Sequence, residues 1–200
     1  MKRSNHASVV RLTSLALLAA LVVVLQTVAS GIRIGPVPIS LTLVPIVVGA
    51  ILFGPGAGAG LGAVFGIVCL IAGITGADQF TNVLWVASPF WLVVVCVGKA
   101  VLCGLCAGLV AKALRQRQTL SCILAALTAP VVNTGVFLLG CRIFFLPMLA
   151  DMAQNLGFGD NVGRFMIIGL VGVNFLAELG INIVLSPVIL RLIRIGRKEN

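Results

Sequence analysis

The chain has 200 residues, of which 60% are hydrophobic and 10% are charged, and its formal net charge is +9. Soluble domains carry about 25% charged residues, so this composition excludes a water-soluble fold and requires a bilayer as solvent. The basic residues lie in short flanks of apolar runs, with no basic patch interleaved with aromatic residues. This distribution argues against nucleic acid and for control of membrane topology.

The first apolar run covers residues 12–30 and follows a basic N-terminal start. It is longer than the apolar core of a secretory signal, which spans about 7–15 residues, so we expect a retained helix. Cleavage after Ser30 is the alternative. A loop rich in Gly and Pro follows at 31–38.

The next two apolar runs, 39–53 and 58–76, flank the sequence Gly54-Pro55-Gly56. Proline lacks an amide donor and glycine does not hold a helix, so this triplet predicts a tight reversal between two helices. Glycine then recurs every four residues from 58 to 66. That spacing predicts a helix face on which another helix approaches at backbone distance.

Three more apolar runs complete the chain. They cover residues 83–113, 120–142 and 164–193, and Pro89 marks an irregular start of the first. The apolar first half of the connection at 143–163 indicates an interfacial segment. Since a crossing needs about 20 residues, the sequence predicts one integral membrane domain over residues 1–200, an all-α bundle of six transmembrane helices with short loops.

The basic residues distribute unequally between the two ends of these spans. If the N-terminus is cytoplasmic, the 114–119 turn and the C-terminus are cytoplasmic too, and this side carries ten Lys and Arg residues against three on the other. Cytoplasmic loops of membrane proteins are enriched in Lys and Arg. We therefore expect both termini to be in the cytoplasm.

Lys99 and Glu178 are charges within predicted spans. A lone charge in mid-bilayer costs about 2.5–3.5 kcal/mol or more, so both should face the bundle interior or water. Counted from the same side of the membrane, they lie about 24 and about 21 Å deep. We therefore predict an ion pair between them. It is either a structural clamp or part of a site that meets a ligand or carries protons.

A second set of polar side chains could line a pocket that opens opposite the termini. Asn133 and Asn174 lie near the middle of their spans, while Trp85 and Arg142 lie toward that opening. Amides, an aromatic wall and one cation would suit an anionic ligand. The alternatives are interhelical hydrogen bonding for the two Asn residues and interfacial anchoring for Trp85 and Arg142.

No catalytic motif accompanies these residues. The six cysteines lie in apolar runs and are interpreted as packing residues, including the C-x-x-C pair Cys103 and Cys106, which lacks a redox context. No zinc-protease, nucleophile-elbow or P-loop pattern occurs. We expect no catalytic residue, no metal and no cofactor.

Four phrases resemble one known family, the substrate-binding S components of energy-coupling factor (ECF) vitamin transporters. They are LVPIVVGAILFGPGAGAGLGAVFG, VGKAVLCGLCAGLVAKAL, APVVNTGVFLLG and NFLAELGINIVLSPVI. The resemblance covers nearly the whole chain. It implies a bacterial cell-membrane subunit that binds a vitamin outside and topples in the membrane to release it inside. The partners it implies are a transmembrane T component and two ATPases.

The resemblance also implies roles for residues. Ala16 and Ala20 would form the Ala-x-x-x-Ala face that docks on the T component. The loop at 31–38, with Arg33, would cover a ligand held by Trp85, Asn133, Arg142 and Asn174. The phrase at 129–140 is most similar to pantothenate-type members, with folate and riboflavin as alternatives.

Two other functions are open on the residues alone. An intramembrane enzyme would use Glu178 or the cysteines, but it needs two convergent acid–base or metal-binding groups, and the sequence offers one membrane carboxylate. A stand-alone secondary carrier would be expected to contain inverted repeats, which are not evident in the sequence.

Overall fold

The computed structural model describes residues 2–29 and 41–196. Arg33 and the rest of the 31–38 loop lie outside these ranges. Within them the chain is a bundle of helices without strands. The elements are α1 (Lys2–Ala29), α2 (Leu43–Phe53), α3 (Pro55–Ile74), α4 (Gln79–Ala87), α5 (Pro89–Ala113), α6 (Gln118–Phe144), α7 (Leu146–Asn155), α8 (Val162–Arg164), the π-helix η1 (Phe165–Gly172) and α9 (Val173–Gly196).

Five stretches of the described helices are long and apolar enough to cross a membrane. They are Ser8–Val28, Pro55–Ile74, Pro89–Ala113, Gln118–Phe144 and Asn174–Arg191. The predicted all-α membrane class is confirmed. The helix within the expected span at 39–53 is short. α2 has 11 residues and rises about 16 Å, whereas the hydrocarbon core is about 30 Å thick.

The expected span at 83–113 is divided at one residue. Ser88 is extended, with φ −162° and ψ 99°, and it separates α4 from α5. A residue before proline is pushed out of the helical region by the proline ring, so Pro89 both ends α4 and begins α5. The irregular start expected at Pro89 is therefore a complete helix break.

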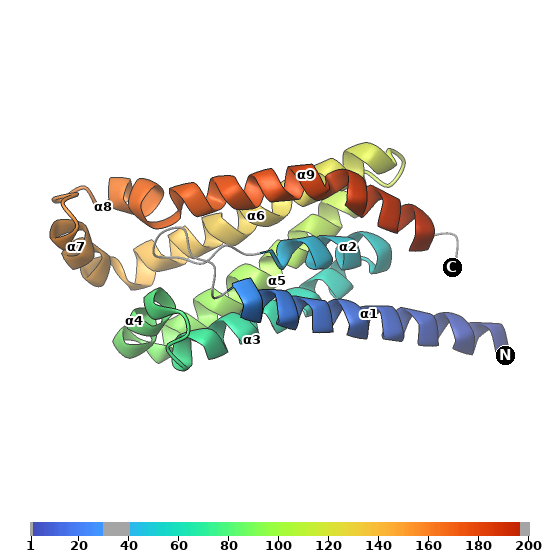
Figure 1. Ribbon diagram of the computed structural model, residues 1–200, viewed down its shortest axis with the longest axis horizontal. Helices are drawn as coiled ribbons and strands as arrows, with labels where there is room; N and C mark the ends of the chain where they lie inside the picture. The colour runs from blue at the N-terminus through green and yellow to red at the C-terminus, as the bar shows by residue number, and fades with distance from the viewer. Residues whose placement is uncertain (1, 30–40, 197–200) are drawn as a thin grey trace.

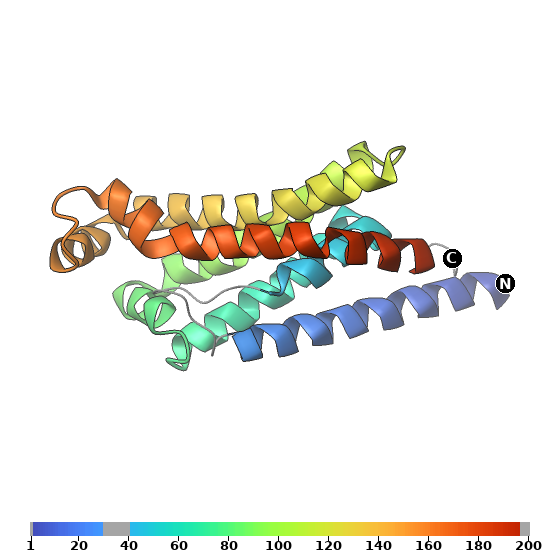
Figure 2. The same cartoon turned by 45° about the horizontal axis from the view of Figure 1, so that its top comes forward.

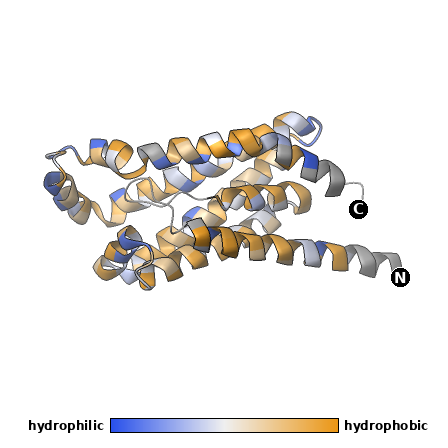
Figure 3. Cartoon of the chain, viewed as in Figure 1, coloured by the Kyte–Doolittle hydropathy of each residue, from blue (hydrophilic) through white to orange (hydrophobic). Residues whose placement is uncertain are grey.

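The two ends of the bundle differ in content. Figures 1 and 2 show α4 and α7 at one end, which we call the loop end, and both chain termini at the other, the termini end. Arg11 donates from Nη2 to the Phe53 carbonyl oxygen over 3.3 Å, so the basic N-terminal flank and the 54–56 hinge lie together. In Figure 3 the helix shafts are mostly apolar and the loop end is rich in hydrophilic residues.

The glycine repeat of α3 packs against α5. Gly58, Gly62 and Gly66 are buried, and a Cβ at Gly66 would lie 2.8 Å from the Cys96 carbonyl oxygen. At Gly62 the clash would be with the carbonyl of Ala100. The predicted close approach is confirmed, and the structure identifies α5 as the partner helix.

Two clusters of buried apolar residues fill the bundle. The first lies toward the termini end and includes Phe65, Ala100 and Ala129, and the second lies toward the loop end and includes Cys96 and Phe137. Lys99 falls between the two clusters on α5, as Asn133 does on α6. A polar layer therefore separates two apolar cores.

Candidate functional site

The polar layer contains side chains that are buried in spite of their cost in a membrane. Asn133, Asn174 and Glu178 expose 5% or less of their surface. On α6, buried residues recur at spacings of three and four, and Asn133 falls on this face. On α9, Asn174 and Glu178 lie four residues apart and therefore share a face. Helix rotation thus turns all three amide and carboxyl groups inward.

These side chains surround a small cavity of about 30 Å³, which is enough room for a water molecule. It lies between α5, α6 and the η1–α9 segment. Its lining residues are Lys99, Asn133, Thr134, Phe137, Val171, Asn174, Phe175 and Glu178. We call it the polar cavity.

Lys99 is held in this cavity by an aromatic contact. Its Nζ lies 4.4 Å from the centroid of the Phe137 ring. A cation over an aromatic face gains about 0.5–2 kcal/mol, more when it is desolvated. Glu178 lines the same cavity from α9, so the two charges meet at one level of the bundle, as their depths suggested. A direct ion pair between them stays a prediction.

The side-chain oxygen of Asn133 is an unsatisfied acceptor in this cavity. Oδ1 of Asn133 is buried and has no hydrogen-bond partner among the described residues. Leaving such an acceptor unpaired costs about 1–3 kcal/mol. Asn182, one turn beyond Glu178, does not line the cavity. Its Nδ2 donates to the Glu178 carbonyl oxygen over 2.8 Å, while its Oδ1 is also buried without a hydrogen-bond partner among the described residues.

The structure separates Arg142 from the two Asn residues. Arg142 is exposed and lies nine residues after Asn133 on α6, about 13 Å further along the helix. It lines a cleft of about 690 Å³ at the loop end, together with Leu146, Asp160, Asn161, Val162 and Gly163. The single pocket expected from the sequence is thus two spaces, a wide loop-end cleft and the polar cavity.

Trp85 is also apart from the polar cavity. It is half-buried on α4 and packs against the loop-end cluster. Its neighbour Asn82 donates from Nδ2 to the Gly73 carbonyl oxygen over 2.8 Å, which ties α4 to α3. Trp91 stacks on Phe144 with ring centroids 3.9 Å apart. In this state the contacts of these aromatic residues are packing contacts.

Ala16 and Ala20 lie on the outside of α1. Both are exposed, and their spacing of four places them on one face of the helix. Leu12 and Leu17 on the same helix are each 71% exposed. Helix α1 packs on α2 and α3 along one side of the bundle (Figure 1), and large apolar side chains on its outer face are exposed.

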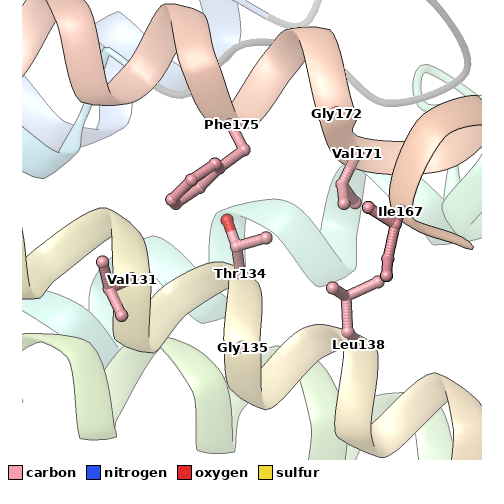
Figure 4. Close-up of a pocket in the computed structure, with 8 residues that line it drawn as sticks. All are labelled: Val131, Thr134, Gly135, Leu138, Ile167, Val171, Gly172 and Phe175. Atoms are coloured by element: carbon pink, nitrogen blue, oxygen red, sulfur yellow. The ribbon is translucent and has the colours of Figure 1, made fainter.

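Sequence reasoning missed an apolar groove next to the polar cavity. It has a volume of about 280 Å³ and lies between α6 and the η1–α9 segment (Figure 4). Its lining residues are Val131, Thr134, Gly135, Leu138, Ile167, Val171, Gly172 and Phe175. A weak signal existed, because Thr134 and Phe175 directly follow the two Asn residues in sequence. We recognised no sequence feature that predicts the π-helix, which forms one wall of the groove.

Comparison with known proteins gives one clear match. A family model described as "ECF transporter, substrate-specific component" matches residues 10–190. The matched range contains every residue that lines the polar cavity and the apolar groove. No curated protein matches the chain, and no solved structure does.

Proposed function

The chain belongs to the family of ECF transporter substrate-specific components, and from this premise we propose that it captures a vitamin at the outer face of the bacterial cell membrane. Pantothenate is the vitamin that we favour, with folate and riboflavin as alternatives. The chain itself carries out no catalysis in this proposal. Partner ATPases supply the energy, and toppling of the subunit within the membrane releases the vitamin inside.

The observation that carries this proposal is the unsatisfied Oδ1 of Asn133 in a cavity that Lys99 also lines. A hydroxyl or amide N–H of a ligand would donate to that oxygen, and a ligand carboxylate would pair with Lys99. Asn174 lines the cavity from the opposite helix. Such a set of groups fits a small hydroxylated carboxylate better than an apolar molecule.

The loop-end cleft has a different role in the proposal. Arg142 and Asp160 both line this cleft, so its wall carries one cation and one anion, and Arg142 is the group that would attract an anionic solute. We propose that Arg142 meets the ligand first and that Asn133 and Asn174 hold it deeper in the bundle. Arg33 and Trp85 complete the predicted ligand set, with Arg33 in the loop that would cover the ligand.

The exposed face of α1 supports a docking role. Small residues at Ala16 and Ala20 allow another helix to approach closely, as in small-xxx-small interfaces. We propose that this face binds the T component. Both termini would then face the cytoplasm. A membrane-impermeant maleimide tests this orientation, because Gln116→Cys should react only after the cells are opened, while Asn155→Cys should react in intact cells.

The test of vitamin capture is a native mass spectrum of the purified chain, followed by titration with pantothenate. We expect one bound vitamin per chain, without chemical turnover. Turnover would support an intramembrane enzyme instead. Uptake by vesicles that lack ATP and the partner subunits would support a stand-alone carrier.

Substitution of Asn133 tests its role in binding. We expect Asn133→Leu to weaken pantothenate binding by about tenfold or more, since one hydrogen bond to the ligand contributes about 1.4 kcal/mol. The melting temperature should stay the same or rise, because the variant removes an unsatisfied buried acceptor while keeping the branched shape and the number of side-chain heavy atoms. A lower melting temperature with unchanged binding would assign Asn133 a structural role only.

A further inference from the structure

The polar cavity and the apolar groove are adjacent spaces with common walls. Thr134, Val171 and Phe175 line both of them. Figure 4 shows the Phe175 ring pointing from α9 toward α6, over Thr134 and Val131. The side chain of Phe175 therefore stands where the two spaces would join.

Volume shows that the polar cavity alone holds no vitamin. Ligand sites have volumes of about 300–1,000 Å³, whereas the polar cavity measures about 30 Å³. With the groove of about 280 Å³, the combined space reaches about 310 Å³. A ligand bound to Asn133 must extend out of the polar cavity, and the groove is the neighbouring space that shares its walls.

The chemistry of the two spaces is opposite. Lysine, amide and carboxyl groups line the polar cavity, whereas the groove is lined by aliphatic residues, glycines, one threonine and one phenylalanine. Two residues of the groove wall, Ile167 and Val131, are exposed on the outer surface of the bundle. A molecule that spans both spaces must therefore have a polar end and an aliphatic part.

The backbone beside the groove is a π-helix, which supports a local rearrangement of this segment. Val171 and Gly172 end the π-helix η1, directly before α9 and Phe175. Segments of π-helix are often found at functional sites because the widened turn interrupts regular helical bonding. A shift of this segment would move Val171 and Phe175 together.

Resting on the vitamin capture proposed above, we infer that the polar cavity and the groove are two chambers of one ligand site, with Phe175 as the partition between them. The ligand class is a small amphipathic molecule. Its polar end binds Asn133 and Lys99, and its aliphatic part displaces the Phe175 ring and occupies the groove. The small combined volume excludes large flat ring systems.

Gly135 allows a test that leaves the packing intact. It lines the groove, and a Cβ built on it meets no atom within 4 Å, so a side chain there enters open space. Gly180 on α9 also has no atom within 4 Å of a Cβ and does not line the groove. Gly135→Leu and Gly180→Leu are therefore a matched pair with similar expected effects on folding.

The probe is pantothenate, titrated into the purified wild-type chain and both variants in nanodiscs. We expect Gly135→Leu to weaken binding by about tenfold or more, because it fills the aliphatic chamber, and Gly180→Leu to bind as wild type does. Melting temperatures should agree within the pair. A Gly135→Leu chain that binds pantothenate as tightly as wild type would overturn the inference.

The remaining outcomes are also decisive. If Gly135→Leu keeps its affinity for pantothenate but loses a phospholipid seen in the native mass spectrum of wild type, the groove is a lipid site. If wild type binds riboflavin and not pantothenate, the inferred ligand class is wrong, although vitamin capture stands. If wild type binds no vitamin at all, the proposed function itself fails.

Discussion

Lys99 shows how a single charge is accommodated within the helices. Its ammonium group contacts the face of Phe137, and it shares the polar cavity with Glu178. An aromatic ring offsets part of the cost of burying a cation but cannot neutralise it. Neutralisation requires an acidic group, and Glu178 lines the same cavity from the facing helix.

The predicted ion pair leads to a test with two substitutions. Glu178→Gln should destabilise the chain by about 3 kcal/mol or more, because it leaves the Lys99 charge uncompensated. Lys99→Gln in the same chain should restore much of this loss. Thermal unfolding in detergent measures both effects. The control is Glu178→Gln combined with Lys112→Gln, an exposed lysine, which should restore nothing. Equal stabilities of the two double variants would contradict the pair.

Among the elements, the contact between α3 and α5 shows most directly how sequence spacing becomes packing. The α3 glycines let the backbones approach until a single Cβ would collide with a carbonyl group of α5. Within a bilayer this close packing stabilises helix association without a hydrophobic driving force. It also fixes the rotation of α5, and thereby the direction of Lys99.

Two glycines of α3 provide a matched comparison of this packing. Gly62→Ala should destabilise the chain by about 1–3 kcal/mol, since its Cβ meets the Ala100 carbonyl. Gly60→Ala, on the exposed face, should be neutral or stabilise by up to about 1 kcal/mol, because alanine favours the helix. Thermal unfolding of the two variants measures the difference. If both behave alike, the glycine face is not what holds α3 to α5.

At the scale of the whole molecule, α1 differs from the other long helices. It packs on α2 and α3 and leaves large apolar side chains such as Leu12 and Leu17 exposed. The polar cavity and the apolar groove lie away from α1, among α5, α6 and the η1–α9 segment. The surface proposed for docking and the site proposed for binding are therefore separate parts of the bundle.

This separation predicts that transport and binding respond differently to one substitution. Ala16→Trp should abolish vitamin uptake in cells that contain the partner subunits, because a large side chain prevents close approach of a helix. Binding of pantothenate to the purified chain should be unchanged. Leu139→Trp, at an exposed position of α6, is the control and should retain uptake. Equal loss of binding and uptake in Ala16→Trp would remove the docking role of α1.

The membrane class, most helix positions, the glycine face and the similar depth of Lys99 and Glu178 could all be predicted from the linear chain. Each of these depends on local quantities, namely the length of apolar runs, the spacing of small residues and the rise per residue of a helix. Pro89 likewise predicted an interruption of the helix, but the sequence did not predict that α4 is a separate helix.

Other features emerged only when the helices were packed together. How each helix is rotated about its axis decides which side chains meet. It brings Asn133, Asn174, Lys99 and Glu178 to one cavity and keeps Arg142 and Trp85 apart from it. It also sets the position of Phe175. Rotation is set by contacts between helices distant in sequence, such as the α3–α5 interface. The π-helix η1 likewise lies at such a contact, where Val171 faces α6 across the groove. Depth in the membrane follows from counting residues, but which side chains meet is a property of the packed bundle.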